Sequence, residues 1–205
     1  MKAIGIFGGA FAPFHNGHLR LALEARERLA LDQVRLVPTA QPVHRPKARI
    51  SPLRRLEWLR LAVKPESALV ADDCEIQRDG PSYTVDTLSQ LATQYPRARR
   101  VLLMGADAFA HFHSWHRWKD ILDLAEVAVV VRPGAALAPP PEAADALRGR
   151  FQPLEIPMLD ISSTRIRRKL RHGRSVRGLL PDAILDSLTA ADIAALTEDE
   201  NPSTH

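Results

Sequence analysis

The sequence contains little cysteine and no long run of apolar residues. Cys74 is the single cysteine among 205 residues, so an internal disulfide cannot form. No apolar run is long enough to span a bilayer. The stretch from Lys2 to Ala12 faintly resembles a signal peptide, but it is short and Gly8 and Gly9 interrupt it. These absences predict a soluble cytoplasmic protein.

Two common phosphate-binding motifs are also missing. The glycines of the first apolar stretch, Gly5, Gly8 and Gly9, lack the G-x-G-x-x-G spacing, and no G-K-[ST] follows them. No internal repeat is visible either. The sequence therefore predicts neither a standard dinucleotide-binding turn nor a P-loop, and any phosphate site must be built in another way.

The overall composition is that of an ordinary globular protein. Hydrophobic residues make up 45% of the chain and charged residues 25%, which allows a sizeable core. The length fits one α/β domain. The formal net charge of +4 suits phosphate-bearing partners, either nucleotides or nucleic acid, without choosing between them.

Apolar runs and helical periodicities alternate along the chain. This order predicts an α/β fold, a Rossmann-like doubly wound parallel sheet with helices on both faces and a small C-terminal helical region. We expect a single domain over residues 1–205, in which residues 161–205 form the C-terminal helical part. Strands are expected at 3–7, 34–37, within 67–76, and at 101–104, 127–131 and 154–156; helices are expected at 17–30, 52–63, 84–95, 115–124, 164–172 and within 181–196.

The segment after the first strand combines paired glycines with two histidines. Gly8 and Gly9 let backbone amides approach a phosphate closely, and the helix that follows adds free amides and a partial positive charge. His15 and His18 are three residues apart, so they can share one face and donate to a phosphate that gains charge in a transition state. A lone histidine is more often a structural turn residue. The coincidence of glycines, spacing and strand-to-helix setting favours phosphate binding here.

Two segments resemble the motifs of a known superfamily. Residues 8–18 are similar to the signature G-G-[ST]-F-D-P-x-H-x-G-H of nucleotidyltransferases, and residues 161–167 are similar to their second signature, I-S-[ST]-T-x-I-R. The resemblance implies catalytic roles for His15, His18 and Arg167. It also implies that ATP is bound by Gly8, Gly9, Ala10, Phe11, Ser162, Ser163 and Thr164.

Segments between the two motifs resemble bacterial nicotinate-mononucleotide adenylyltransferases. His44 and Arg45 resemble the basic loop that reaches the triphosphate in that family. Gly105 and Asp107 are similar to its G-x-D segment, which contacts ribose and adenosine. The resemblance therefore implies that these four residues also bind ATP.

The remaining matches concern the acceptor. Ser82, Tyr83 and Thr84 resemble the segment whose backbone meets the nicotinate carboxylate, as suits amides at a helix start. Trp115 resembles a tryptophan stacked on the pyridine ring, and Arg132 an arginine near a phosphate. The resemblance implies that these five residues bind nicotinate mononucleotide.

Together these matches imply transfer of the adenylyl group of ATP to nicotinate mononucleotide, giving deamido-NAD and pyrophosphate in NAD biosynthesis. Mg²⁺ is the expected cofactor, carried by ATP, and no metal-binding residues are predicted. Neither nucleic acid nor a membrane is an expected partner, and the chain is a monomer or a homo-oligomer.

Three alternatives remain open. A related enzyme could use another acceptor, such as nicotinamide mononucleotide or phosphopantetheine. A degenerate nucleotide-binding regulator is suggested by Ala10 and Ala12, where the signature has a hydroxyl residue and an aspartate. Binding of RNA is suggested by charge alone.

Overall fold

The structure, a computed structural model, describes residues 1–43, 49–157 and 159–198. Within these ranges six strands form one parallel sheet in the order β3-β2-β1-β4-β5-β6. The order of the strands reverses between β1 and β4, and loops that diverge at such a point leave a crevice at the carboxyl ends of the strands. The predicted Rossmann-like sheet is thus confirmed. The strands are β1 (Ala3–Gly9), β2 (Gln33–Pro38), β3 (Leu69–Ala71), β4 (Arg99–Gly105), β5 (Glu126–Val131) and β6 (Phe151–Glu155).

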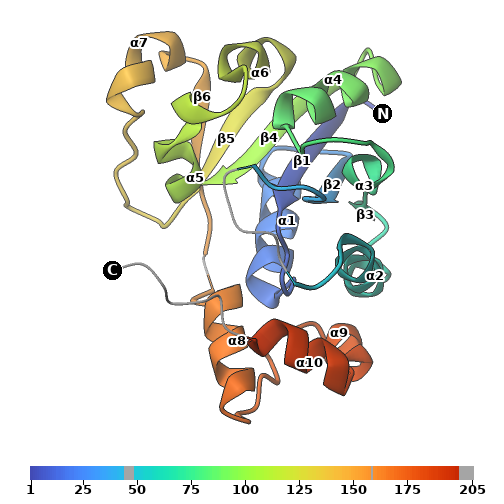
Figure 1. Cartoon of the computed structure of the whole chain (residues 1–205). Helices are drawn as coiled ribbons and strands as arrows, with labels where there is room; N and C mark the ends of the chain where they lie inside the picture. The colour runs from blue at the N-terminus through green and yellow to red at the C-terminus, as the bar shows by residue number, and fades with distance from the viewer. Residues whose placement is uncertain (44–48, 158, 199–205) are drawn as a thin grey trace.

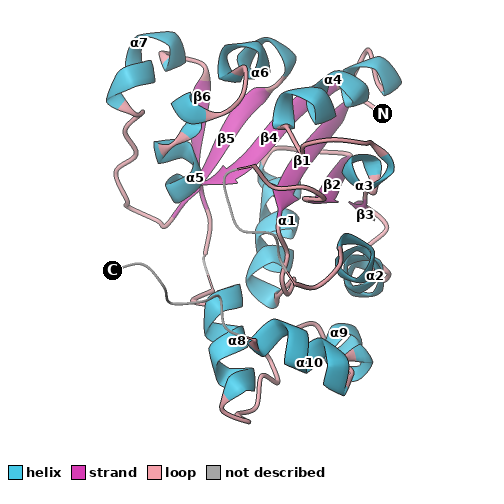
Figure 2. Cartoon of the chain, viewed as in Figure 1, coloured by secondary structure: helices cyan, strands magenta, loops and turns pink. Residues whose placement is uncertain are grey.

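Helices cover both faces of the sheet (Figure 2). Side chains alternate along β1, so Phe7 packs into one hydrophobic cluster with Trp58, whereas Ile6 packs into the other with Leu88. None of the helices in the described ranges is long and apolar enough to cross a membrane. The helices around the sheet are α1 (Asn16–Arg28), α2 (Pro52–Val63), α3 (Cys74–Gln77), α4 (Thr84–Gln94), α5 (Ala106–Ala110), α6 (Trp118–Leu124) and α7 (Ala144–Leu147).

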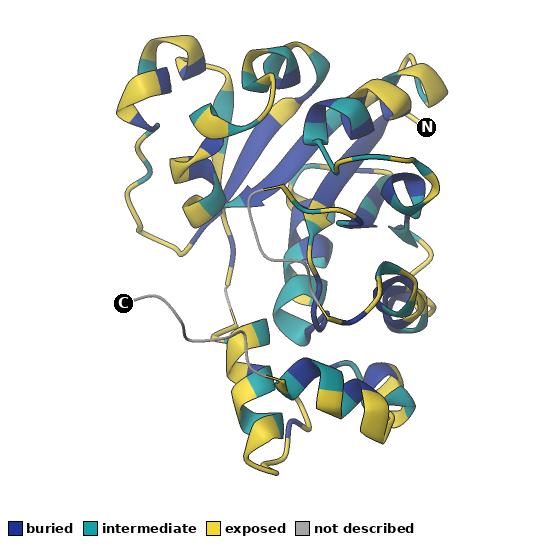
Figure 3. Cartoon of the chain, in the orientation of Figure 1, coloured by how far each residue is buried: buried dark blue, intermediate teal, exposed yellow. Residues whose placement is uncertain are grey.

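The C-terminal helices α8 (Ser163–Arg171), α9 (Asp182–Ser187) and α10 (Ala190–Thr197) lie together beyond α1 and α2 (Figure 1). They carry more exposed surface than the strands of the sheet (Figure 3). Ile166 of α8 and Ile184 of α9 are fully buried in the same cluster as Trp58 of α2. The C-terminal helices therefore share one of the two cores of the sheet domain.

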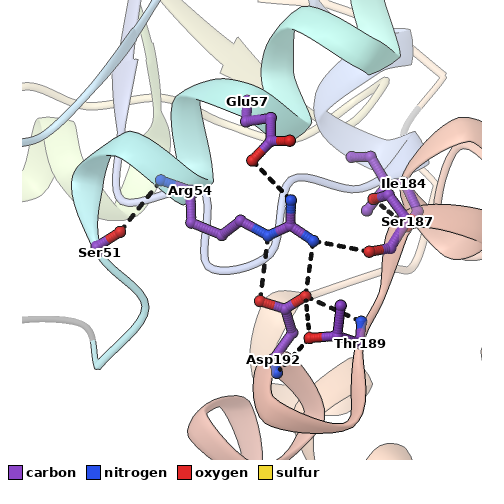
Figure 4. Close-up of polar contacts among 7 residues, drawn as sticks. All are labelled: Ser51, Arg54, Glu57, Ile184, Ser187, Thr189 and Asp192. Atoms are coloured by element: carbon purple, nitrogen blue, oxygen red, sulfur yellow. Dashed lines mark hydrogen bonds and ion pairs between the residues drawn. The ribbon is translucent and has the colours of Figure 1, made fainter.

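An ion pair fixes this group to α2 (Figure 4). The Arg54 guanidinium lies 2.7 Å from Asp192 Oδ2 and donates to the Ser187 carbonyl at 2.7 Å. Its Nε also contacts Asp192 Oδ1 at 3.1 Å, so the pair is bidentate. Asp192 in turn caps α10 in a reciprocal arrangement with Thr189. Arg54 thus joins the start of α2 to the end of α9 and to α10.

The boundaries of several elements differ from the sequence prediction. The helix expected at 115–124 begins only at Trp118, because Arg117 has a left-handed backbone with φ of 51°. Trp115 instead follows a short 3₁₀ turn, η1 (Phe112–Ser114). Helices α3, α5 and α7 were not predicted, since four or five residues are too few to show a helical period.

Candidate active site

The loop after β1 leaves the centre of the sheet with open backbone amides. Within the described part of the chain, the N–H groups of Ala10 and Phe11 have no hydrogen-bond acceptor. The Ala10 carbonyl accepts from Arg55 Nη1 at 2.7 Å. Because C=O and N–H point in opposite directions in a trans peptide, the Phe11 N–H points away from Arg55. The loop therefore offers donors of the kind that bind an anion.

Phe11 contributes only its backbone to this loop. Its side chain is 3% exposed, and its ring lies edge-on to the rings of Phe7, Phe14 and His18, with centroids 5.1–5.5 Å apart. The residue has a positive φ of 47°, which a non-glycine residue rarely adopts and which this packing maintains. A Cβ at Gly9 would lie 2.9 Å from the Phe11 ring, so the glycine leaves space for it.

His15 and His18 form a stacked pair at the start of α1. Their ring centroids are 3.6 Å apart and their planes differ by 18°. Each ring uses Nδ1 to accept a backbone N–H, His15 from residue 18 and His18 from residue 15, both at 3.3 Å. A neutral imidazole that accepts at Nδ1 carries its proton at Nε2. Both rings are therefore fixed in the tautomer that donates through Nε2.

Burial keeps both rings neutral. It lowers the pKa of His15 to about 4, although a backbone hydrogen bond partly opposes this change. The pKa of His18 is also well below its usual value, first because of burial and second because of the neighbouring His15. At neutral pH the pair acts as two hydrogen-bond donors, without a positive charge.

The two motifs that lie far apart in the sequence are in contact here. Ser163 Oγ donates to the Pro13 carbonyl at 3.0 Å, and Arg167 Nη1 donates to the Ala12 carbonyl at 2.9 Å. A Cβ at Gly17 would lie 3.0 Å from His15 Nδ1 and 3.6 Å from Ile161 Cβ, so the glycine of H-x-G-H lets the second motif approach. The N-terminus of α8 thus faces the first loop.

The other residues of the second motif line the start of α8. Ser162 caps the helix, since its Oγ accepts from the Arg165 amide at 3.2 Å. Arg167 Nη2 donates to Thr164 Oγ1 at 3.3 Å. These contacts hold the first turn in place beside the loop.

Two further ATP-binding residues predicted from the sequence follow β4. Gly105 ends this strand and precedes α5, in which Asp107 lies exposed in the first turn. Since β4 pairs with β1, both residues lie at the same edge of the sheet as the first loop. His44 and Arg45 lie outside the described residues.

Four of the five predicted acceptor residues lie around the start of α4. Tyr83 stacks on His116 with ring centroids 4.1 Å apart, and Thr84 opens the helix without a side-chain cap. Trp115, which is half-buried, precedes His116 and lies 5.5 Å from the Phe112 ring. An uncapped helix start next to exposed aromatic edges suits a flat ring that bears a carboxylate.

Two of the predicted acceptor residues have other contacts. The Ser82 hydroxyl accepts the amides of Ala40 and Gln41, each at 3.0 Å, and so ties the loop after β2 to the start of α4. Arg132 is largely exposed and lies 4.0 Å from Asp160, just before α8. Arg132 thus lies beside the segment that leads into the second motif.

Arg55 and Asn16 contact the site but were not predicted. Arg55, at 2% exposure, holds the Ala10 carbonyl from α2. Asn16 Nδ2 donates to the carbonyls of Gly178 and Leu180, at 2.9 and 3.2 Å, and ties the start of α1 to the segment before α9. The contacts that bring these residues to the site leave no local signal in the sequence, because Ala10 lies 45 positions from Arg55 and Gly178 lies 162 positions from Asn16.

Comparison with known families defines the class of this protein. The sequence model of the cytidylyltransferase-like family matches residues 6–169, a span that begins in β1 and ends in α8. The matched span contains both motifs. With this fold, the match identifies the chain as a nucleotidyltransferase.

Individual relatives give the narrower family. The chain is 42% identical to a probable nicotinate-nucleotide adenylyltransferase of Pseudomonas fluorescens, over 92% of this chain and 95% of that protein. It is also 42% identical to the corresponding protein of Marinobacter nauticus, over 90% and 93% of the two chains. The chain belongs to the nicotinate-nucleotide adenylyltransferase family.

A solved structure supports the same fold. Plasmodium falciparum nicotinic acid mononucleotide adenylyltransferase, complexed with NaAD, superposes with a TM-score of 0.70 at 16% identity. The match covers 96% of this chain and 95% of the Plasmodium chain. The common architecture thus extends over almost the full length of both chains.

Proposed function

We propose that this protein transfers the adenylyl group of ATP to nicotinate mononucleotide in NAD biosynthesis. A phosphate oxygen of the mononucleotide attacks the α-phosphorus of ATP, and the bond to the β-phosphate oxygen breaks. The electron pair leaves with pyrophosphate, and deamido-NAD is the second product. The observation that carries this proposal is the contact between the loop after β1 and the start of α8 in a chain of this family.

The loop and α8 would act on the triphosphate. Neutral His15 and His18 donate from Nε2 to phosphate oxygens that gain charge during transfer, and the amides of Ala10 and Phe11 add two further donors. Arg167, together with His44 and Arg45, would neutralise the leaving pyrophosphate. The reaction needs no nucleophilic side chain, because the phosphate of the acceptor is itself the nucleophile.

The start of α4 would bind the acceptor. The uncapped amide of Thr84 favours a carboxylate over a neutral carboxamide, because a helix N-terminus stabilises negative charge. Trp115 and Tyr83 supply flat surfaces for the pyridine ring. This geometry supports nicotinate mononucleotide, and not its amide, as the acceptor.

ATP would enter as a complex with a divalent cation, which we propose is magnesium. In the described ranges, no group of three His, Cys, Asp or Glu residues could hold a metal ion. Magnesium commonly binds substrate phosphates and keeps several waters, so triphosphate oxygens and water can supply its ligands. The cation is then part of the substrate.

The test is pyrophosphate release by the purified protein with ATP, magnesium and nicotinate mononucleotide, with deamido-NAD identified by mass. We expect turnover, and weaker turnover with nicotinamide mononucleotide. Absence of pyrophosphate would refute the assignment. Preference for phosphopantetheine would replace the acceptor, and tight ATP binding without turnover on any acceptor would favour the regulator that Ala10 and Ala12 suggest.

A further inference from the structure

Arg55 is a buried cation directly behind the first loop. Its guanidinium donates to three main-chain carbonyls: Ala10 and Thr39, each at 2.7 Å, and Ile50 at 3.3 Å. The residue is 2% exposed. Its neighbour Arg54 points to the C-terminal helices instead and pairs with Asp192 (Figure 4). Two consecutive arginines of α2 therefore serve opposite sides of the helix.

No hydrogen-bonded carboxylate among the described residues neutralises the charge of Arg55, since its guanidinium donates to main-chain carbonyls. Burial lowers its pKa to about 10, and nearby Glu75 partly opposes that change. The guanidinium thus stays charged at neutral pH. A buried charge without a bonded counter-ion is costly to keep, and an anionic ligand nearby would offset this cost.

The two 2.7 Å hydrogen bonds of Arg55 connect two loops at the carboxyl ends of the strands. Ala10 belongs to the loop after β1, and Thr39 begins the loop after β2. The Thr39 amide also donates to the Gly9 carbonyl at 2.9 Å, so the two loops are already adjacent. The Ala10 carbonyl and the Phe11 N–H belong to the same planar peptide group. By binding this carbonyl, Arg55 therefore also fixes the direction of the Phe11 N–H.

We propose that Arg55 is a positioning residue for the phosphates of the nucleotide. It holds the loops after β1 and β2 against each other, so that the open amides of Ala10 and Phe11 face the phosphates. It also places a buried positive charge behind these amides. The proposal rests on the proposed function for the identity of the nucleotide, ATP. It predicts that the contribution of Arg55 grows with the number of phosphates bound.

The experiment compares Arg55→Lys and Arg55→Gln with the wild type. Lysine keeps the charge but replaces the planar guanidinium fork with one compact ammonium group, whereas glutamine keeps a donor without the charge. Binding of AMP, ADP and ATP is measured by calorimetry, and KM is measured separately for ATP and for the acceptor. We expect ATP affinity to fall about tenfold or more in both variants, AMP affinity to change less than about threefold, and acceptor KM to stay within about twofold.

Arg100 offers a matched control, because it also donates to three main-chain carbonyls, those of Tyr95, Ala98 and Leu124. It lies near the start of β4, at the opposite end of that strand from Gly105. Arg100→Lys and Arg100→Gln should leave nucleotide and acceptor affinities unchanged, and thermal unfolding of all four variants gives their loss of stability.

Three results would overturn the proposal: wild-type ATP affinity in the Arg55 variants, an equal loss for AMP and ATP, or a parallel loss of acceptor binding. If Arg55→Gln does not fold, Arg55→Lys alone decides by the same comparison of AMP with ATP. Failure of the proposed function has a different signature, because a wild type that binds ATP but releases no pyrophosphate still reports the effect of Arg55 on binding.

Discussion

On the triphosphate side of the site, side chains from two other helices hold the main chain of the first loop; on the acceptor side, the corresponding contacts are those of Ser82 with the amides of Ala40 and Gln41. Carbonyls of Ala10, Ala12 and Pro13 accept from Arg55, Arg167 and Ser163. By contrast, Tyr83 and Trp115 contact mainly other rings and are partly exposed.

The difference indicates which half is preorganised. Donors that stabilise developing charge must be fixed before the reaction, because moving them costs energy at the transition state. Binding a pyridine ring that bears a carboxylate requires only an aromatic surface and a backbone amide. The acceptor side of the site can therefore be less rigid than the triphosphate side. We therefore expect substitutions on the triphosphate side to reduce kcat, and those on the acceptor side to raise KM.

The largest expected effect is on the histidine pair. His15→Ala and His18→Ala should each lower kcat about 10²–10³-fold, because each removes an Nε2–H donor, with little change in the KM of the acceptor. His15→Asn separates chemistry from folding, since asparagine is a good N-cap and should preserve stability while kcat still falls. His172→Ala, exposed at the end of α8, serves as control. A His15→Asn enzyme with wild-type kcat would show that His15 is only a cap.

The next effect concerns the frame that holds α8. Asp192→Asn should lower the free energy of unfolding by about 1–3 kcal/mol at pH 7, because it removes the charge that pairs with Arg54. Pairing with Arg54 lowers the pKa of Asp192 from 3.8 to about 2. This stabilisation is therefore complete above about pH 4 and is lost as the pH falls through 2.

Urea unfolding at pH 7 and at pH 3 measures this difference. Asp145→Asn is the matched control, because its ion pair with Arg148 is almost fully exposed. An Asp192 variant as stable as the Asp145 variant would mean that the Arg54 pair does not anchor the C-terminal helices.

A smaller effect is expected on the acceptor side. Trp115→Leu should raise the KM of the acceptor about tenfold and leave the KM of ATP within about twofold, since only stacking on the ring is lost. Trp118→Leu, at the first residue of α6, tests whether any tryptophan near Phe112 has the same effect. A rise in the KM of ATP with Trp115→Leu would contradict the division into two halves.

The smallest effect is expected from restoring a hydroxyl to the first loop. Ala10 is exposed, so Ala10→Ser should fold normally and tighten ATP binding about two- to fivefold through one added hydrogen bond. Titration with ATP measures this gain. Unchanged affinity would indicate that the backbone donors already saturate the phosphate, as the clamps on this side suggest.

Local patterns predicted much of the architecture. The strand at 3–7, the Ser51–Pro52 helix start and the alternation of strands with helices were all visible, because buried strands and caps depend on neighbouring residues. The start of α6 was predicted wrongly at Trp115, because Arg117 has a left-handed backbone, which the helical periodicity of the sequence does not reveal. The roles of the predicted site residues stay predictions until the variants are measured.

The departures at Ala10 and Ala12 show a limit of motif matching. The sequence shows that the usual hydroxyl and carboxylate are missing. The structure shows that Arg55 and Arg167 donate to the main-chain carbonyls of Ala10 and Ala12. These contacts do not involve the side chains at the two positions. Main-chain contacts of this kind leave no mark in a motif.

The sequence by itself determined the alternation of strands with the longer helices and the similarity of residues 8–18 and 161–167 to two known motifs, from which phosphate binding by the first loop is predicted. Only the tertiary structure decided that α8 touches the Ala12 and Pro13 carbonyls, that both histidines are neutral, and that Arg55 lies behind the loop. The physical reason is that helix and strand patterns arise between neighbours along the chain. Desolvation and clamping arise between segments that only folding brings together.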